Sequence, residues 1–137
     1  MRWAGEIMPK LSCPTQTAAV LIVDGVESSR AFVRTTLSGL PLNVEEADDG
    51  GTAFERLLTR RFNLLITDLY TGPIDGVKLV LAAGLLQADR RPKTMICSPA
   101  THSFDTAQQQ AMRVADKIIA KPIDPEGLVA AVTELLA

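Results

Sequence analysis

The sequence has few cysteines, few aromatic residues and no long apolar run, and each of these shortages limits what the protein can be. It contains only two cysteines, Cys13 and Cys97, which form neither a disulfide framework nor a metal-site spacing. No run of about 18 apolar residues occurs, so no transmembrane helix is predicted. Aromatic residues make up 4% of the 137 residues. A hydrophobic core must therefore consist of Val, Leu, Ile and Ala.

An excess of charge of one sign is also lacking. The formal net charge is −2 at pH 7, which provides no electrostatic attraction to nucleic acid or to an anionic membrane. Two short basic clusters, Arg60-Arg61 and Arg90-Arg91-Pro92-Lys93, are local and are predicted to be solvated. The N-terminal residues include no apolar stretch of signal-peptide length. We therefore predict a cytoplasmic protein with no nucleic-acid or membrane partner.

Apolar runs of strand length alternate with helical patterns along most of the chain. Residues 1–18 hold Pro, Gly and many polar side chains and are predicted to form a flexible tail, followed by one folded domain at residues 19–137. We expect strands at residues 20–23, 42–47, 62–67, 94–97 and 117–120. We expect helices at about residues 28–40, 52–60, 77–87, 104–114 and 125–136.

The fivefold alternation of strand and helix predicts the fold class. It indicates an α/β protein with a doubly wound five-stranded parallel sheet and helices on both faces, the flavodoxin-like (βα)5 arrangement. Residues 42–47 are apolar only at every second position, which is typical of an edge strand. Sheets of this kind place their functional site at the carboxyl ends of the strands, where the strand order reverses.

Four polar residues directly follow the predicted strands. They are Asp24 after the first strand, Asp68 after the third, Ser98 after the fourth and Lys121 after the fifth. Because the carboxyl ends of parallel strands share one edge of a sheet, we expect these side chains to converge. Two carboxylates, a hydroxyl and an ammonium suit a divalent cation together with a phosphoryl group. The carboxylate of Asp68 is the candidate nucleophile, which would form an acyl phosphate.

At these positions the sequence resembles the receiver domain of bacterial response regulators. The resemblance covers about residues 19–137, and no single motif carries it alone. It depends on the order and spacing of Val20-Leu21-Ile22-Val23-Asp24, Ala47-Asp48-Asp49-Gly50, Asp68-Leu69-Tyr70, Asp75-Gly76, Ser98 and Lys121-Pro122.

The resemblance implies a mechanism. Asp68 would accept a phosphoryl group from a phosphohistidine on a sensor histidine kinase or a histidine phosphotransfer protein. Mg²⁺ would be held by Asp24, by Asp68 and by the backbone carbonyl of Tyr70. Ser98 would donate a hydrogen bond to the bound phosphoryl group, and Lys121 would pair with it. The peptide bond between Lys121 and its following proline is expected to be cis.

The resemblance also implies how the signal leaves the domain. Phosphorylation would be communicated to a downstream protein target through the surface formed by residues 104–114, 117–120 and 125–136. The domain would be a monomer or a weak dimer in a phosphorelay or signal-transduction pathway. It would not be an enzyme, apart from catalysing its own phosphorylation and dephosphorylation.

Two departures from the family pattern leave a second function open. The family has an acidic pair after the first strand, and here Gly25 replaces the second acid, which predicts weaker Mg²⁺ binding. The aromatic residue expected in the fifth strand is Ile118, which has no ring to reorient. The alternative is a degenerate receiver that acts as a phosphorylation-independent protein-interaction module.

Unrelated enzymes with the same fold fit the sequence less well. A flavodoxin-like protein needs a phosphate-binding loop after the first strand, but Asp24 and Glu27 in this loop would repel a phosphate. A phosphatase of the haloacid dehalogenase type needs a second aspartate two residues after the nucleophile, and that position is Tyr70. Because a fold hosts many functions, the site residues decide between these possibilities.

Overall fold

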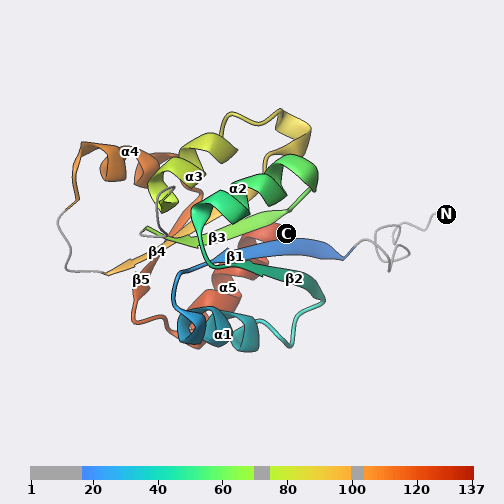
Figure 1. Ribbon diagram of the computed structural model, residues 1–137. Helices are drawn as coiled ribbons and strands as arrows, with labels where there is room; N and C mark the ends of the chain where they lie inside the picture. Colours follow the sequence, from blue (N-terminus) through green and yellow to red (C-terminus); the bar gives the residue numbers. More distant parts are fainter. Residues whose placement is uncertain (1–16, 70–74, 100–103) are drawn as a thin grey trace.

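Five strands and five α-helices alternate along the residues that the computed structural model describes, which are 17–69, 75–99 and 104–137 (Figure 1). The strands are β1 (Ala18–Val23), β2 (Leu42–Ala47), β3 (Leu64–Asp68), β4 (Lys93–Pro99) and β5 (Lys117–Lys121). The helices are α1 (Glu27–Thr36), α2 (Gly50–Thr59), α3 (Gly76–Ala83), α4 (Thr106–Val114) and α5 (Pro125–Leu136), with a short 3-10 helix at Ala88–Arg90. Most of the expected N-terminal tail lies outside the described residues.

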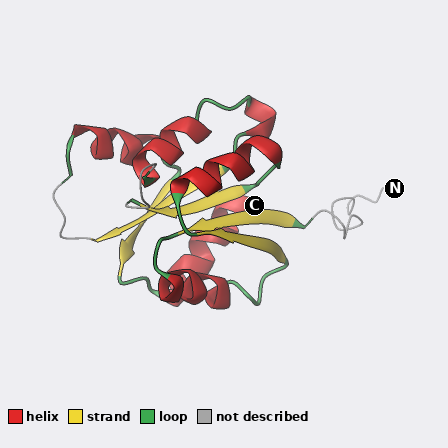
Figure 2. Cartoon of the chain, in the orientation of Figure 1, coloured by secondary structure: helices red, strands yellow, loops and turns green. Residues whose placement is uncertain are grey.

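All neighbouring strands pair in parallel, in the order β2-β1-β3-β4-β5 (Figure 2). The prediction of an edge strand at residues 42–47 is confirmed, because β2 pairs only with β1 in this sheet. The chain runs outward from β1 to β2 and then crosses back to β3, so the strand order reverses between β1 and β3. This reversal separates the two loops that carry Asp24 and Asp68.

Helices cover both faces of the sheet, and each face has its own core (Figure 1). Helices α1 and α5 lie on one face, where Val33 and Leu128 pack with Ile22 and Ile66 of the sheet. Helices α2, α3 and α4 lie on the other face. None of the helices in the described part of the chain has both the length and the apolar character needed to cross a bilayer.

Two predicted helices end earlier in the structure than the sequence pattern indicated. The helix predicted to reach Leu40 ends at Thr36, because the chain turns at Leu37 and continues through a bond from the Leu40 N–H to the Leu37 carbonyl. The helix predicted to reach Gln87 ends at Ala83, with Gly84 as its cap. Glycine is a poor residue within a helix, which accounts for the second early end.

Four aspartates serve as helix N-caps. The side chains of Asp49, Asp75, Asp105 and Asp124 accept hydrogen bonds from backbone N–H groups in the first turns of α2, α3, α4 and α5. Such caps stabilise a helix by about 1 kcal/mol each. Asp24 and Asp68 do not cap a helix in this way, so their side chains remain available for another role.

Candidate functional site

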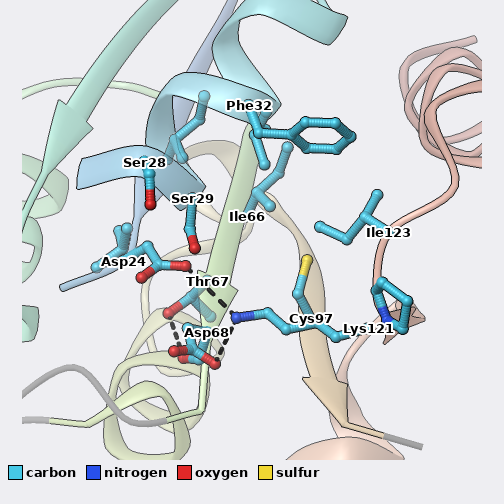
Figure 3. A pocket seen from close by; sticks show the side chains of 14 residues that line it. Asp24, Ser28, Ser29, Phe32, Ile66, Thr67, Asp68, Cys97, Lys121 and Ile123 are labelled. Atoms are coloured by element: carbon cyan, nitrogen blue, oxygen red, sulfur yellow. Dashed lines mark hydrogen bonds and ion pairs between the residues drawn. The ribbon is translucent and has the colours of Figure 1, made fainter. Parts of the chain in front are cut away.

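Three charged side chains meet at the carboxyl end of the sheet (Figure 3). The Lys121 Nζ atom lies 3.3 Å from Oδ1 of Asp68 and 3.5 Å from Oδ2 of Asp24. The side chains of the two carboxylates are only 11% and 16% exposed for Asp24 and Asp68, respectively. The predicted convergence of Asp24, Asp68 and Lys121 is therefore observed, at the point where the strand order reverses.

The backbone and one arginine fix the position of Asp24. Its N–H donates to the Ala47 carbonyl of β2, and its Oδ1 accepts from the Val26 N–H at 2.8 Å. The Arg30 Nη1 atom donates to the Asp24 carbonyl at 2.7 Å, while Nε of the same guanidinium pairs with Glu46. These contacts leave Oδ2 of Asp24 directed toward Lys121.

Asp68 is the last residue of β3, and hydrogen bonds hold the backbone on either side of it. Its Oδ1 accepts a hydrogen bond from the Leu69 N–H at 2.8 Å, and the Thr67 hydroxyl donates to its backbone carbonyl. The Gly76 N–H donates to the Leu69 carbonyl at 2.8 Å, which ties the start of α3 to the end of β3. The acceptor carboxylate therefore stands on a well-anchored segment.

Lys121 ends β5 and is partly buried. Burial lowers the pKa of its ammonium, but the carboxylates of Asp68 and Asp24 outweigh burial and raise this pKa above its usual value. The group is therefore fully charged at physiological pH. The peptide bond between Lys121 and Pro122 is cis, which confirms the prediction.

Ser98 lies near the end of β4, next to the strand that carries Asp68. The β4 residue that pairs with Asp68 is Cys97, and Ser98 is the next residue, only 3% exposed. Side chains alternate along a strand, and Cys97 belongs to the core beneath α1 and α5. Ser98 is thus directed toward the opposite face of the sheet, together with the side of β5 that carries Ile118. Its predicted contact with a phosphoryl group stays a prediction.

The sequence interpretation missed two residues near the site. Arg30 binds the Asp24 carbonyl, and only its spacing of six residues from Asp24 on the following helix could have indicated this. Cys97 was assigned to the core, yet it also lines a cavity with Asp24, Asp68 and Lys121. Burial raises the pKa of the Cys97 thiol to about 12, so it remains protonated and is no reactive thiolate.

The cavity beside these charged groups has a volume of about 230 Å³. It opens between α1 and the segment that follows β5, and its walls include Phe32, Ile66 and Ile123 in addition to the charged residues. Figure 3 shows these apolar side chains at one end of the cavity and the charged groups at the other.

Two carboxylates are the ligands that the described residues offer to Mg²⁺. No group of three or more His, Cys, Asp or Glu side chains suited to a metal occurs among them. The Tyr70 carbonyl, the third predicted ligand, lies outside the described residues. Proteins commonly bind Mg²⁺ through one or two carboxylates and several waters. Asp24 and Asp68 therefore fit this ion, with one acid fewer than the resemblance implies because residue 25 is glycine.

A model of the response regulator receiver domain family matches residues 20–133. The chain belongs to this family. A receiver domain is a signalling domain of two-component systems and not a classical enzyme. The match covers the sheet from Val20 onward, helices α1 to α4 in full and α5 as far as Thr133, so the family assignment made from the strand-end residues is confirmed.

Individual relatives agree with this assignment. The response regulator receiver protein CpdR of Brucella abortus is 27% identical over 117 residues, which are 85% of this chain and 95% of CpdR. The chemotaxis protein CheY of Pseudomonas aeruginosa is 36% identical over 75 residues, which are 54% of this chain and 58% of CheY. The structure of the chemotaxis response regulator CheY4 of Vibrio cholerae has a TM-score of 0.76 at 27% identity, covering 88% of this chain and 100% of the CheY4 chain. The predicted fold class is therefore confirmed.

Proposed function

We propose that this receiver domain accepts a phosphoryl group on Asp68 from a phosphohistidine of a histidine kinase or a histidine phosphotransfer protein. The observation that carries the proposal is the ammonium of Lys121 at 3.3 Å from Oδ1 of Asp68. A fixed cation beside the acceptor carboxylate can offset the negative charge that accumulates when a phosphoryl group arrives.

The transfer exchanges one bond to phosphorus for another. A carboxylate oxygen of Asp68 attacks the phosphorus atom, and the P–N bond to the donor histidine breaks as the new O–P bond forms. The histidine leaves as a neutral imidazole once it holds a proton on its ring. Oδ1 already accepts from Leu69 and faces Lys121, so we assign the attack to Oδ2.

Asp24 and Asp68 would hold Mg²⁺ in this reaction. The bound ion would neutralise charge on the transferring phosphoryl group. The replacement of an acid by Gly25 predicts that the ion is held weakly. We further assign Ser98 to the bound phosphoryl group, which it would reach by turning from its buried position on β4.

The output surface is proposed to be α4, β5 and α5. Val114 on α4 and Ile118 on β5 are 53% and 43% exposed, respectively, although both are large and apolar. Exposed apolar side chains on adjacent elements are typical of a surface that binds another protein. We propose that a downstream protein target binds there, and that the domain itself is a monomer or a weak dimer in the cytoplasm.

Intact-mass spectrometry tests the proposal. The protein is incubated with a small phosphodonor and Mg²⁺, and one added phosphoryl group is expected. Hydroxylamine treatment should then remove the added phosphoryl group and leave a hydroxamate in its place, because hydroxylamine displaces phosphate from acyl phosphates. Samples with EDTA and the variant Asp68→Asn should show no addition, whereas Asp89→Asn, at an exposed carboxylate, should behave as wild type.

The opposite outcome is equally informative. If the folded protein gains no mass at saturating Mg²⁺, the proposed phosphoryl transfer is wrong. The phosphorylation-independent interaction module would then be the better description, and partner binding should be the same for wild type and Asp68→Asn.

A further inference from the structure

The cavity beside Asp68 has two chemically different ends. In Figure 3, the sulfur of Cys97 points toward Phe32 and Ile123, and together with Ile66 these side chains form an apolar end. The charged groups of Asp24, Asp68 and Lys121 stand at the other end. A cavity with an apolar wall and a few convergent polar groups is the usual form of a small-molecule site.

The size of the cavity sets the size of its ligand. Its volume is about 230 Å³. A dry apolar cavity of about 150 Å³ is large enough to bind benzene. One six-membered ring with a short side chain therefore fits. Phe32 on α1 is 41% exposed, so the apolar end can be reached from solvent without opening the core.

The charge at the polar end selects the sign of the ligand. Two carboxylates and the single ammonium of Lys121 leave one net negative charge. The guanidinium of Arg30 is not part of the cavity wall, since it donates to the backbone carbonyl of Asp24 and pairs with Glu46 at 3.1 Å. A bound anion would add a second negative charge in a partly buried place, whereas a cation would balance the site.

We propose that this cavity binds a small organic cation, in which a primary ammonium is joined by a short linker to one aromatic or aliphatic ring. The ammonium donates to Asp24 and Asp68, and the ring packs between Phe32, Ile123 and Cys97. Binding of this kind needs neither Mg²⁺ nor a phosphoryl group. Binding of the cation can therefore be tested independently of the phosphorylation of Asp68.

Three probes of similar size and different charge test the proposal: benzylamine, benzyl alcohol and benzoate. Each is titrated into the full chain without Mg²⁺ or phosphodonor, and amide chemical shifts are followed by NMR. Benzylamine is expected to bind with a Kd of about 1 mM, a usual affinity for so small a ligand. Benzyl alcohol should bind about fivefold more weakly, because it lacks a charge-assisted hydrogen bond, and benzoate weakest of all.

Variants separate the two ends of the cavity. Cys97→Leu extends a side chain into the apolar end and should abolish benzylamine binding while the carboxylates remain. Ile123→Phe fills the cavity from its half-buried rim and provides the same test if the core substitution prevents folding. Asp24→Asn removes the net negative charge, so benzylamine should bind no better than benzyl alcohol.

The site is established if benzylamine binds more tightly than benzyl alcohol, if benzoate binds most weakly, and if Cys97→Leu and Ile123→Phe abolish benzylamine binding. The proposal is overturned if benzoate binds as well as benzylamine. It is also overturned if no probe shifts the resonances of residues that line the cavity, or if both folded filled-cavity variants bind benzylamine as tightly as wild type.

Discussion

The backbone carbonyl of Asp68 lies so close to Gly76 that a β-carbon on residue 76 would stand 1.9 Å from its oxygen. No side chain can be accommodated there without moving the backbone that carries the acceptor carboxylate. We therefore expect Gly76→Ala to lower the free energy of unfolding by about 3 kcal/mol, as overpacked sites do. Phosphorylation of Asp68 should fall with it, because the end of β3 must shift. Urea denaturation and intact mass measure the two effects.

A second glycine provides the control for this substitution. A β-carbon on Gly39 would meet nothing within 4 Å. Gly39→Ala should therefore change the free energy of unfolding by no more than about 0.5 kcal/mol and leave phosphorylation intact. Equal effects at the two positions would show that the close approach of Gly76 to Asp68 is not what requires glycine.

Restoring the acid after β1 should strengthen Mg²⁺ binding. A β-carbon on Gly25 would have only the Asp48 carbonyl within 4 Å, at 3.7 Å, which is an ordinary contact. Gly25→Asp therefore fits, and its carboxylate adds a third negative charge beside Asp24 and Asp68. We expect the Mg²⁺ concentration for half-maximal phosphorylation to fall about tenfold. Gly25→Asn has nearly the same shape without the charge, and an equal fall with Asn would contradict the electrostatic explanation.

Glu46 should contribute a pH-dependent part of the stability. Burial raises the pKa of its carboxyl, but the guanidinium groups of Arg34 and Arg30 outweigh burial and hold the pKa below its usual value. A carboxyl whose folded pKa is lowered stabilises the protein above its unfolded pKa and loses that contribution as pH falls through the folded pKa.

The variant Glu46→Gln isolates this contribution. We expect it to cost about 1 kcal/mol at neutral pH, since the pair is partly exposed, and to cost progressively less below about pH 4.5. Urea denaturation at several pH values checks this, with Glu55→Gln on the exposed side of α2 as the control. A cost that stays constant down to pH 3 would rule out the ion pair as its cause.

The sequence predicted the charged part of the site because only topology was needed. Asp24, Asp68 and Lys121 follow three strands of a parallel sheet, and parallel strands end at one edge. The direction of Ser98 depends on the register between β3 and β4, in which Asp68 pairs with Cys97. Fully buried strands are apolar on both faces, so their sequences do not reveal this register.

The cavity could not be predicted from the sequence for a related reason. It exists because Phe32, Cys97 and Ile123, which are far apart in the chain, leave space between them. Helix ends were similarly difficult: Leu37 and Leu40 continue the apolar spacing of α1, but the backbone already turns there. Local patterns predict the presence of an element more reliably than its last turn.

Lys121 should compete with Mg²⁺ for the two carboxylates, because its ammonium lies within 3.5 Å of both. The variant Lys121→Met removes this charge and leaves two uncompensated carboxylates. They should bind Mg²⁺ about fivefold more tightly, because roughly 1 kcal/mol of attraction between the ammonium and the carboxylates no longer competes with the ion. The same variant should accept a phosphoryl group poorly, because no cation then balances the product. The control is Lys117→Met. Lys117 lies on the same strand as Lys121 but pairs with Glu134 of α5, so this variant should change neither property. Calorimetric Mg²⁺ titration measures the first effect and intact mass measures the second. Weaker Mg²⁺ binding by Lys121→Met would show that the lysine supports the metal site and does not oppose it.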